Sequence, residues 1–225
     1  MKCQILLERF LGIILYSVML NNIGSILSYI LHPMIVSTFT FWFIIYQTMS
    51  TIDNRDLIFF LSFFFSTVAP IVTVLYLKNQ GLIKDLDASN RKERLLPMAF
   101  RALFFLIGFI ILRKINSPII IQGIMFCSLM NTIIVWLITK HWKISIHTLS
   151  VSSGITIFWL LGYKYFFPML LILVLTTVSR LITNSHTLSQ TVFGIVIGII
   201  STLSLIHIWR CRRYAVCRSR WSPYH

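Results

Sequence analysis

The longest uncharged stretch of the sequence places the strongest limit on what this chain can fold into. Phe10 to Ile52 contains no Asp, Glu, Lys or Arg. A transmembrane helix needs about 20 mostly apolar residues, so the stretch is too long for one span. It is interrupted at His32 and Pro33, where proline removes a backbone donor and disfavours helix at the residue before it. We therefore expect a short apolar leading segment and then a span over Met34 to Thr48.

More apolar runs follow, and together they account for most of the chain. Leu57 to Leu77 is a run of 21 uncharged residues, with Pro70 as an expected kink. The later runs are Met98 to Leu112, Pro118 to Thr139, His147 to Tyr163, Tyr165 to Ser179 and Thr187 to Thr202. Hydrophobic residues make up 57% of the chain and charged residues 12%, which leaves no room for a large aqueous domain. The sequence predicts an all-α polytopic transmembrane bundle of six to seven spans, with first apolar segments at 10–48 and a core at 57–202.

The basic residues lie mainly in the connections between these runs. The net charge is +14, from 20 Lys and Arg against 6 Asp and Glu. Nucleic-acid binding needs a basic face on a soluble surface, so this placement favours lipid head groups or phosphate-bearing substrates instead. The segment Lys78 to Pro97 is the longest hydrophilic loop that the sequence predicts. Even numbers of expected crossings separate it from Lys140 to His147 and from Arg180 to His186, so we expect all three on one side of the membrane.

The last 23 residues, 203–225, differ from the rest of the chain. They read LSLIHIWRCRRYAVCRSRWSPYH, with five arginines and no acid. This string resembles the translation of transposase-end and flow-cell primer DNA from sequencing libraries. We expect residues 203–225 to be an adapter-derived, non-native tail and residues 1–202 to be the membrane domain. The alternative is a basic juxtamembrane segment that binds anionic lipid.

The predicted loops also supply the residue types that metal-free phosphoryl transfer needs. Fixed cations bind the equatorial oxygens, a nucleophile attacks phosphorus, and an acid protonates the leaving oxygen. Arginine binds two oxygens at once and stays charged, and histidine has a pKa near neutrality. The candidates are Lys84, Arg91, Arg94, Ser145, His147, Arg180, His186 and Gln190.

Three short patterns carry a resemblance to a known family. Ser179-Arg180, five residues, His186, three residues and Gln190 follow the spacing Ser-Arg-x5-His-x3-Asp. Ile144-Ser145-Ile146-His147 keeps the serine and histidine of Pro-Ser-Gly-His, and Lys84 with Arg91 has the spacing of Lys-x6-Arg-Pro, where Lys92 replaces the proline. Arg94, three residues before Pro97, is the other candidate for that arginine. In these motifs the chain resembles the phosphatidic acid phosphatase type 2 and haloperoxidase-like superfamily, in a divergent bacterial branch.

The resemblance implies a lipid phosphatase that works without a metal or other cofactor. His186 would attack phosphorus to give a phosphohistidine, and His147 would protonate the departing lipid alkoxide. Arg180, Arg91, Arg94 and Lys84 would bind the phosphate, and Ser145 would add a hydroxyl or backbone donor. The expected partners are a phosphorylated lipid and the bilayer, not nucleic acid. The expected location is the inner (cytoplasmic) membrane of a bacterium, crossed several times, with the site facing outward.

Gln190 stands where the family has an aspartate, and this departure leaves two alternatives open. An amide oxygen accepts the same hydrogen bond from the nucleophilic histidine but brings no charge, so the chain could bind or transport a phosphorylated lipid without hydrolysing it. The other alternative is a membrane prenyltransferase that holds magnesium diphosphate on Asp85, Asp87 and Glu93. The remaining acidic pair, Asp53 and Asp56, is expected on the opposite face, which disfavours a two-sided metal clamp.

Overall fold

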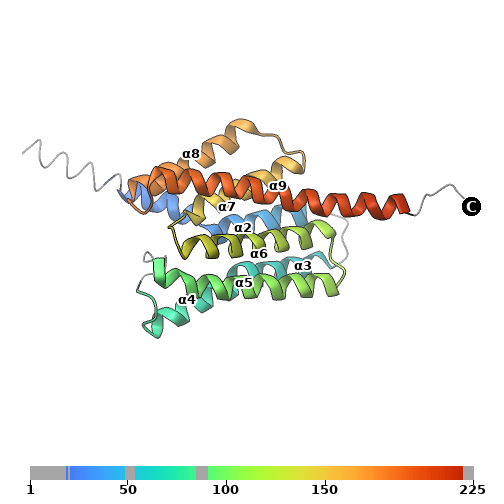
Figure 1. The fold of residues 1–225 in the computed structure, drawn as a ribbon, viewed down its shortest axis with the longest axis horizontal. Coiled ribbons are helices and arrows are strands. Elements are labelled where there is room, and N and C mark those ends of the chain that lie inside the picture. Colours follow the sequence, from blue (N-terminus) through green and yellow to red (C-terminus); the bar gives the residue numbers. More distant parts are fainter. Residues whose placement is uncertain (1–18, 20, 49–53, 85–90, 220–225) are drawn as a thin grey trace, which may run out of the picture.

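The described part of the protein is all-helical, as the sequence predicts. The computed structural model describes residues 19, 21–48, 54–84 and 91–219, with side chains described as far as residue 204. These residues form helices joined by short turns, and they contain no strand. Figure 1 shows the helices lying alongside one another, with α4 at one edge of the bundle and α8 at the other.

The first helical stretch breaks at the histidine–proline pair. Residues 21–30 are helical, and α2 (Pro33–Phe43) begins after Leu31 and His32 and continues into a π-helical turn, η1 (Ile44–Thr48). His32 is the N-cap of α2, because its Nδ1 accepts a hydrogen bond from the backbone N–H of Met34 at 3.3 Å. Pro33 occupies the first turn, where its missing N–H costs no helical hydrogen bond.

The remaining helices coincide with the apolar runs of the sequence. A second long stretch consists of α3 (Arg55–Phe63), a π-helical turn η2 (Phe64–Val68) and α4 (Ala69–Asn79), so the irregularity expected at Pro70 occurs just before it. The helices that follow are α5 (Arg91–Lys114), α6 (Ile119–Thr139), α7 (Ile146–Leu160), α8 (Phe166–Ile182) and α9 (Leu188–Ser219).

The loop predicted over Lys78 to Pro97 is too long. Helix α4 continues to Asn79 and α5 begins at Arg91, so Pro97 lies inside a helix. The indole N–H of Trp136 on α6 donates to the carbonyl of Leu95 at 3.1 Å and fixes this first part of α5 against its neighbour. The prediction was wrong here because polar residues show where the apolar segment ends, whereas the helix extends beyond it.

Helix α9 is longer than the run Thr187 to Thr202 that predicts it. Its backbone remains helical to Ser219, and Figure 1 shows its last part extending past the other helices. The expected domain boundary after residue 202 therefore does not coincide with a helix end. The interpretation of residues 203–225 as an adapter-derived tail stays a prediction.

Helix α7 occupies the centre of its half of the bundle. It packs mainly against α9 and also against α2 and α8, while α5 packs mainly against α6. Two glycines of α9 allow its close approach to α7, since a Cβ on Gly194 would lie 2.7 Å from the carbonyl oxygen of Ser145 and one on Gly198 would lie 2.6 Å from that of Leu149. The main apolar core joins α2, α3, α5 and α6 and includes Phe41, Ile44, Ile45, Ile58, Phe105, Leu112, Ile121 and Met125.

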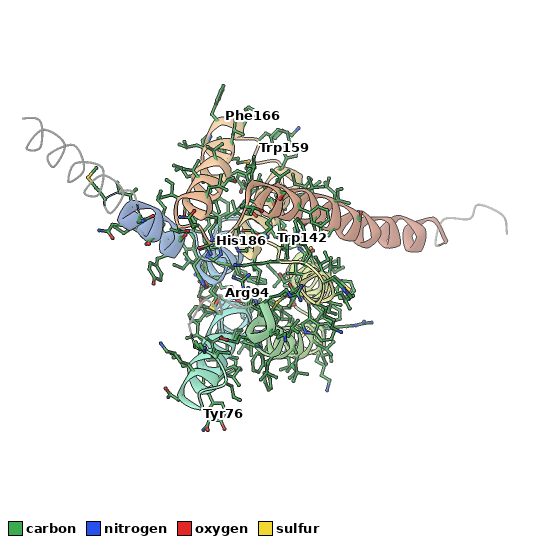
Figure 2. The ribbon with its side chains drawn as sticks, turned by 60° about the vertical axis from the view of Figure 1, so that its left-hand side comes forward. Tyr76, Arg94, Trp142, Trp159, Phe166 and His186 are labelled. Atoms are coloured by element: carbon green, nitrogen blue, oxygen red, sulfur yellow. The ribbon has the colours of Figure 1, made fainter. Side chains whose placement is uncertain are left out.

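Among the described residues, four helical stretches are long and apolar enough to cross a membrane. They are Asn21–Thr48, Arg55–Asn79, Arg91–Lys114 and Ile119–Thr139. Large apolar side chains cover the outside of the bundle, and Figure 2 shows Tyr76 and Phe166 pointing away from it at opposite edges. Helices α7 and α8 and residues 188–204 of α9 are also apolar but shorter. The bundle thus has the composition of a membrane protein, with four helices of full spanning length.

Candidate active site

A large cavity lies between α2, the α3–η2–α4 stretch and α5. Its volume is about 810 Å³, and most of its wall is aliphatic or aromatic. Five side chains that can carry charge also line it: His32, Arg94, Arg101, His147 and His186. A cavity of this kind fits a ligand that is largely apolar and anionic in one region.

The polar residues gather where several helices begin. The N-terminal ends of α2 and α7 meet, since the rings of His32 and His147 lie edge to face with centroids 5.2 Å apart. The start of α9 joins them through a hydrogen bond from the backbone N–H of Ser145 to the carbonyl of Gln190 at 3.3 Å. Helix N-termini carry partial positive charge and unpaired N–H groups, so their convergence favours an anion.

Two arginines of α5 share one face of that helix. Arg94 and Arg101 are seven residues apart, which is two helical turns, and both line the cavity. The exposed fraction of Arg94 is only 7%. Figure 2 shows Arg94 and His186 close to the middle of the molecule. The side of α5 that faces the cavity therefore carries positive charge at two positions along the helix axis.

His186 lies in the turn between α8 and α9, and its tautomer follows from its neighbours. The Oε1 atom of Gln190 lies 3.1 Å from the Nδ1 atom of His186 and accepts a hydrogen bond from the backbone N–H of Thr187 at 3.2 Å. A backbone N–H can only donate, so this atom of Gln190 is the amide oxygen. The Nδ1 atom of His186 must then carry the proton that it shares with Gln190. Its Nε2 atom keeps a lone pair, as a nucleophile requires.

His186 is held in the neutral form by its surroundings. Its exposed fraction is 6%. The pKa of His186 is lowered from 6.5 to about 3, first by burial and then by the positive charges of Arg94, Lys143 and Arg180, against a raising effect of the hydrogen bond to Gln190. A neutral imidazole with a free Nε2 is the reactive form for attack on phosphorus.

His147 stands in the first turn of α7, behind a serine cap. Ser145 is the N-cap of this helix, and its hydroxyl accepts a hydrogen bond from the N–H of Thr148 at 3.5 Å. His147 is 7% exposed, and its Nε2 atom is buried without a hydrogen-bond partner among the described residues. A buried polar atom normally has a partner, so this one is available to a ligand in the cavity.

Arg180 is anchored at the end of α8 by the helix over residues 21–30. Its Nη1 atom donates to the hydroxyl of Ser28 at 3.1 Å, and the hydroxyl of Ser179 donates to the carbonyl of Gly24 at 2.9 Å. Arg180 is 3% exposed. It does not line the cavity itself but lies close enough for its charge to lower the pKa values of His186 and Lys143.

The structure does not bring every candidate residue into the cavity. The guanidinium of Arg91 is exposed and donates to the backbone carbonyl of His141, which ties the start of α5 to the α6–α7 turn. Lys84 is exposed, and its backbone N–H donates to the carboxylate of Glu93 at 3.0 Å. Neither residue lines the cavity.

The acidic residues of the prenyltransferase alternative are largely outside the description. Asp53, Asp85 and Asp87 all lie outside the described residues. Asp56 accepts a hydrogen bond from the hydroxyl of Tyr46 at 2.7 Å. Among the residues that are described, no three His, Cys, Asp or Glu side chains gather in a way that could hold a metal ion. The prenyltransferase alternative therefore stays a prediction.

Positive charge accumulates around the histidines from separate parts of the chain. Lys143, in the turn between α6 and α7, has a lowered pKa because it is partly buried and because Arg94 and Arg180 lie near it. These three cations come from α5, α8 and the turn that precedes α7. Like charges repel at close range, so a bound dianion would relieve the repulsion and stabilise the arrangement.

Sequence reasoning missed two residues of this site, His32 and Arg101. His32 was interpreted only as part of a helix break, yet its ring contacts that of His147. Arg101 lies inside the apolar run Met98 to Leu112 and belongs to none of the three motifs. A rule that treats every ionisable residue inside an apolar run as functional would have selected both. Helical periodicity also selects Arg101, because residues seven positions apart lie on the same face of a helix and Arg94 is already a candidate.

Comparisons with known proteins give no match. No family model, no curated protein and no solved structure matches the chain. The case for a function therefore depends on the geometry of the cavity and on the motif spacing.

Proposed function

We propose that this chain is a membrane lipid phosphatase that hydrolyses a phosphomonoester or diphosphate of a lipid through a phosphohistidine intermediate. The arrangement of His186 carries the proposal. Its Nδ1–H is held by Gln190, its Nε2 keeps a lone pair, and buried cations surround it beside an apolar cavity. The resemblance of the three motifs to the phosphatidic acid phosphatase type 2 superfamily points to the same chemistry.

In the first step the Nε2 atom of His186 attacks the phosphorus of the bound lipid. The bond between Nε2 and phosphorus forms as the bond between phosphorus and the lipid oxygen breaks, and His147 gives its proton to that oxygen. Arg94 binds the non-bridging oxygens, where negative charge is concentrated in the transition state, and the buried charge of Arg180 stabilises them from outside the cavity wall. Arg91 is not assigned to this role, because it is held at the carbonyl of His141.

In the second step water hydrolyses the phosphohistidine. The water oxygen attacks phosphorus and passes a proton to His147, which now acts as the base, and the bond from phosphorus to Nε2 breaks. One residue serves as acid and then as base because the second step mirrors the first. Inorganic phosphate leaves, and His186 and His147 return to their starting protonation states.

The apolar wall of the cavity suits the hydrocarbon part of the substrate. Aromatic residues line it on α2 and α3, including Phe39, Trp42, Phe59 and Phe63. Phe39 is 51% exposed and Trp42 40%, so this wall reaches the outer surface of the bundle. Phosphatidic acid, phosphatidylglycerol phosphate and polyprenyl diphosphates all combine such a chain with the required phosphate.

We also propose that the three shorter helices cross the membrane, which makes seven spans. Helix α7 has 15 residues and α8 has 17, or roughly 23 and 26 Å, against an apolar core of about 30 Å. Because α7 packs between α2, α8 and α9, its ends need not reach both head-group regions. The proposed location is the cytoplasmic membrane of a bacterium, as the family resemblance implies.

A second candidate function is binding or transport of a phosphorylated lipid without hydrolysis. Gln190 favours it, since the neutral amide orients His186 but does not stabilise the imidazolium that develops during attack. The cavity and the cations would serve a binding protein equally well. The two candidates differ only in turnover.

The test is phosphate release from a panel of lipids by the purified protein in detergent. The proposal predicts release from at least one lipid in the presence of a chelator, and loss of at least about 10³-fold in kcat for His186→Ala, because a nucleophile is removed. His141→Ala is the matched control, since that histidine is exposed and outside the cavity. Tight lipid binding without release by the wild type would support the binding protein instead, and equal release by wild type and His186→Ala would overturn both the nucleophile and the mechanism.

A further inference from the structure

One cation in the cavity has no role in the proposed mechanism. Arg101 lies two turns along α5 from Arg94, or about 10 Å along the helix axis, and it lines the same cavity. It stands inside Arg91–Lys114, one of the helices long enough to span a membrane. A charge placed inside an apolar helix is costly, and such residues are usually functional.

Arg101 has little in the protein to satisfy its charge. Its Nε atom is buried without a hydrogen-bond partner, and its guanidinium lies over the ring of Phe105, 5.4 Å from the centroid. Among the described residues no hydrogen bond and no salt bridge to Arg101 is found. A cation–π contact is worth only about 0.5–2 kcal/mol and does not replace the hydrogen bonds that a guanidinium makes in water.

The position of Arg101 in the cavity fits a second anionic group on the ligand. The imidazoles and Arg94 lie near the starts of α2, α5, α7 and α9, whereas Arg101 lies two turns further along α5. A substrate that puts its terminal phosphate at His186 and its hydrocarbon along the wall brings any inner phosphate toward Arg101. A bidentate guanidinium is the group best suited to meet it.

We propose that Arg101 binds the inner phosphodiester of a phospholipid whose head group ends in a second phosphate, and so selects lipids with two separated phosphates over those with one. This inference rests on the proposed function, because it takes His186 as the place of the terminal phosphate. A directly fused diphosphate fits less well, since its two phosphorus atoms are close enough to share Arg94. Phosphatidylglycerol phosphate has the required form, and phosphatidic acid lacks the inner anion.

A purely structural role for Arg101 is the main competing explanation. Its side chain also borders a small second cavity of about 80 Å³, which is lined by Ser128, Asn131 and Ser153 among others. Asn131 contributes a buried Oδ1 atom that has no partner among the described residues. That space suits a few water molecules and is too small for a phospholipid head group. If Arg101 served to order this region, its removal would destabilise the fold.

Binding and stability measurements on Arg101→Gln and Arg101→Met separate the two explanations. Each variant is compared with wild type in a His186→Ala background, with Arg113→Gln as the control, because Arg113 is an exposed cation at the far end of the same helix. The probes are phosphatidylglycerol phosphate, phosphatidic acid and a polyprenyl diphosphate in mixed micelles. The readouts are the Kd of each lipid and the Tm without lipid.

The proposal predicts that Arg101→Gln and Arg101→Met weaken binding of phosphatidylglycerol phosphate by about 10- to 100-fold, the range for a hydrogen bond to a charged group, and weaken phosphatidic acid at least tenfold less. The lipid-free Tm should be unchanged or raised, because an unsatisfied buried charge is removed. Equal weakening for both phospholipids, a larger loss for the diphosphate or a lowered Tm would overturn the proposal. Since turnover is not measured, failure of the hydrolase proposal shows separately as absent phosphate release from a protein that still binds lipid.

Discussion

At the scale of single residues, the contact between His186 and Gln190 decides how the site works. An aspartate at position 190 would accept the same Nδ1–H and add a negative charge. In the serine-protease triad the opposite change, from a carboxylate to an amide, lowers kcat about 10⁴-fold. In the proposed mechanism the amide therefore positions His186 for attack but gives up part of the rate that a carboxylate would supply.

Replacing Gln190 by Asp should keep or raise phosphatase turnover and should change its pH dependence. The attacking imidazole must be neutral, so kcat/KM falls as the pH drops through the pKa of His186. That pKa is lowered to about 3 in the wild type, and an added carboxylate raises it. The acid limb of the kcat/KM profile should therefore move to higher pH in Gln190→Asp, while turnover at neutral pH does not decrease.

Two further substitutions make this prediction decisive. Gln190→Glu keeps the observed side-chain length and should shift the acid limb in the same direction as Asp. Gln190→Leu removes the acceptor and should lower kcat. A large loss of turnover in both acidic variants would mean that Gln190 has a role other than orienting His186.

The sequence predicted which of these residues lie together only where they are close to one another along the chain. Ser179 and Arg180 end α8, His186 lies in the turn after it and Gln190 stands in the first turn of α9, so local geometry brings them together. His32 reaches His147 only because α2 packs against α7. Pairings of this kind depend on tertiary packing, which a spacing rule does not contain.

At the scale of elements, the contact between α7 and α9 holds together the first turn of α7, which carries His147, and the turn that carries His186. Gly194 lies one turn after Gln190 and directly against Ser145, whose N–H donates to the Gln190 carbonyl. Gly194 and Gly198 are four residues apart, a spacing that permits close approach of another helix but does not identify it. The structure identifies α7 as that helix and shows that the approach positions His186 relative to His147.

Gly194→Ala should therefore reduce both stability and activity. The added Cβ would lie 2.7 Å from the carbonyl oxygen of Ser145, which forces α9 away from α7 and costs about 1–3 kcal/mol of unfolding free energy. A displacement of about 1 Å at the catalytic groups can lower kcat roughly 100-fold. Thermal unfolding in detergent and phosphate release measure the two effects.

A glycine further along α9 separates the effect on stability from the effect on activity. Gly198→Ala meets the carbonyl of Leu149 one turn further from the site, so it should destabilise the protein with a smaller loss of kcat. Gly154 on α7 is the control, since a Cβ there meets its nearest neighbour, Val36, at an ordinary 3.4 Å. If Gly194→Ala matched Gly154→Ala in both stability and kcat, the close contact between α7 and α9 would not be what holds the site.

At the scale of the whole molecule, the apolar runs predicted the helices well and their ends poorly. The all-helical fold and the order of its helices follow from the runs, because a bilayer requires continuous helical hydrogen bonding. The first two turns of α5, with Arg91 and Arg94, were predicted as loop because their residues are polar. This error matters for the site, since helical phase is what puts Arg94 and Arg101 on one face.

Cysteine labelling from the two sides of intact vesicles tests the number of spans. Seven spans place His141 and Asn184 on the same side and Asn116 and Lys164 on the other, and all four residues are exposed. Each position is replaced by Cys in a background without the native cysteines and treated with a membrane-impermeant maleimide. Labelling of Lys164→Cys from the same side as Asn184→Cys would mean that α8 does not cross, and the seven-span arrangement would be wrong.

The most direct test of the whole account is to trap the covalent intermediate. A substrate with a good leaving group needs no acid in the first step, whereas hydrolysis of the intermediate still needs His147 as base. His147→Ala treated with ³²P-labelled p-nitrophenyl phosphate and quenched in alkaline detergent should retain acid-labile, base-stable label on the peptide that contains His186. The account predicts that His186→Ala abolishes this label and that His141→Ala does not. Phosphate release by His147→Ala with no label on His186, or label on another residue, would contradict it.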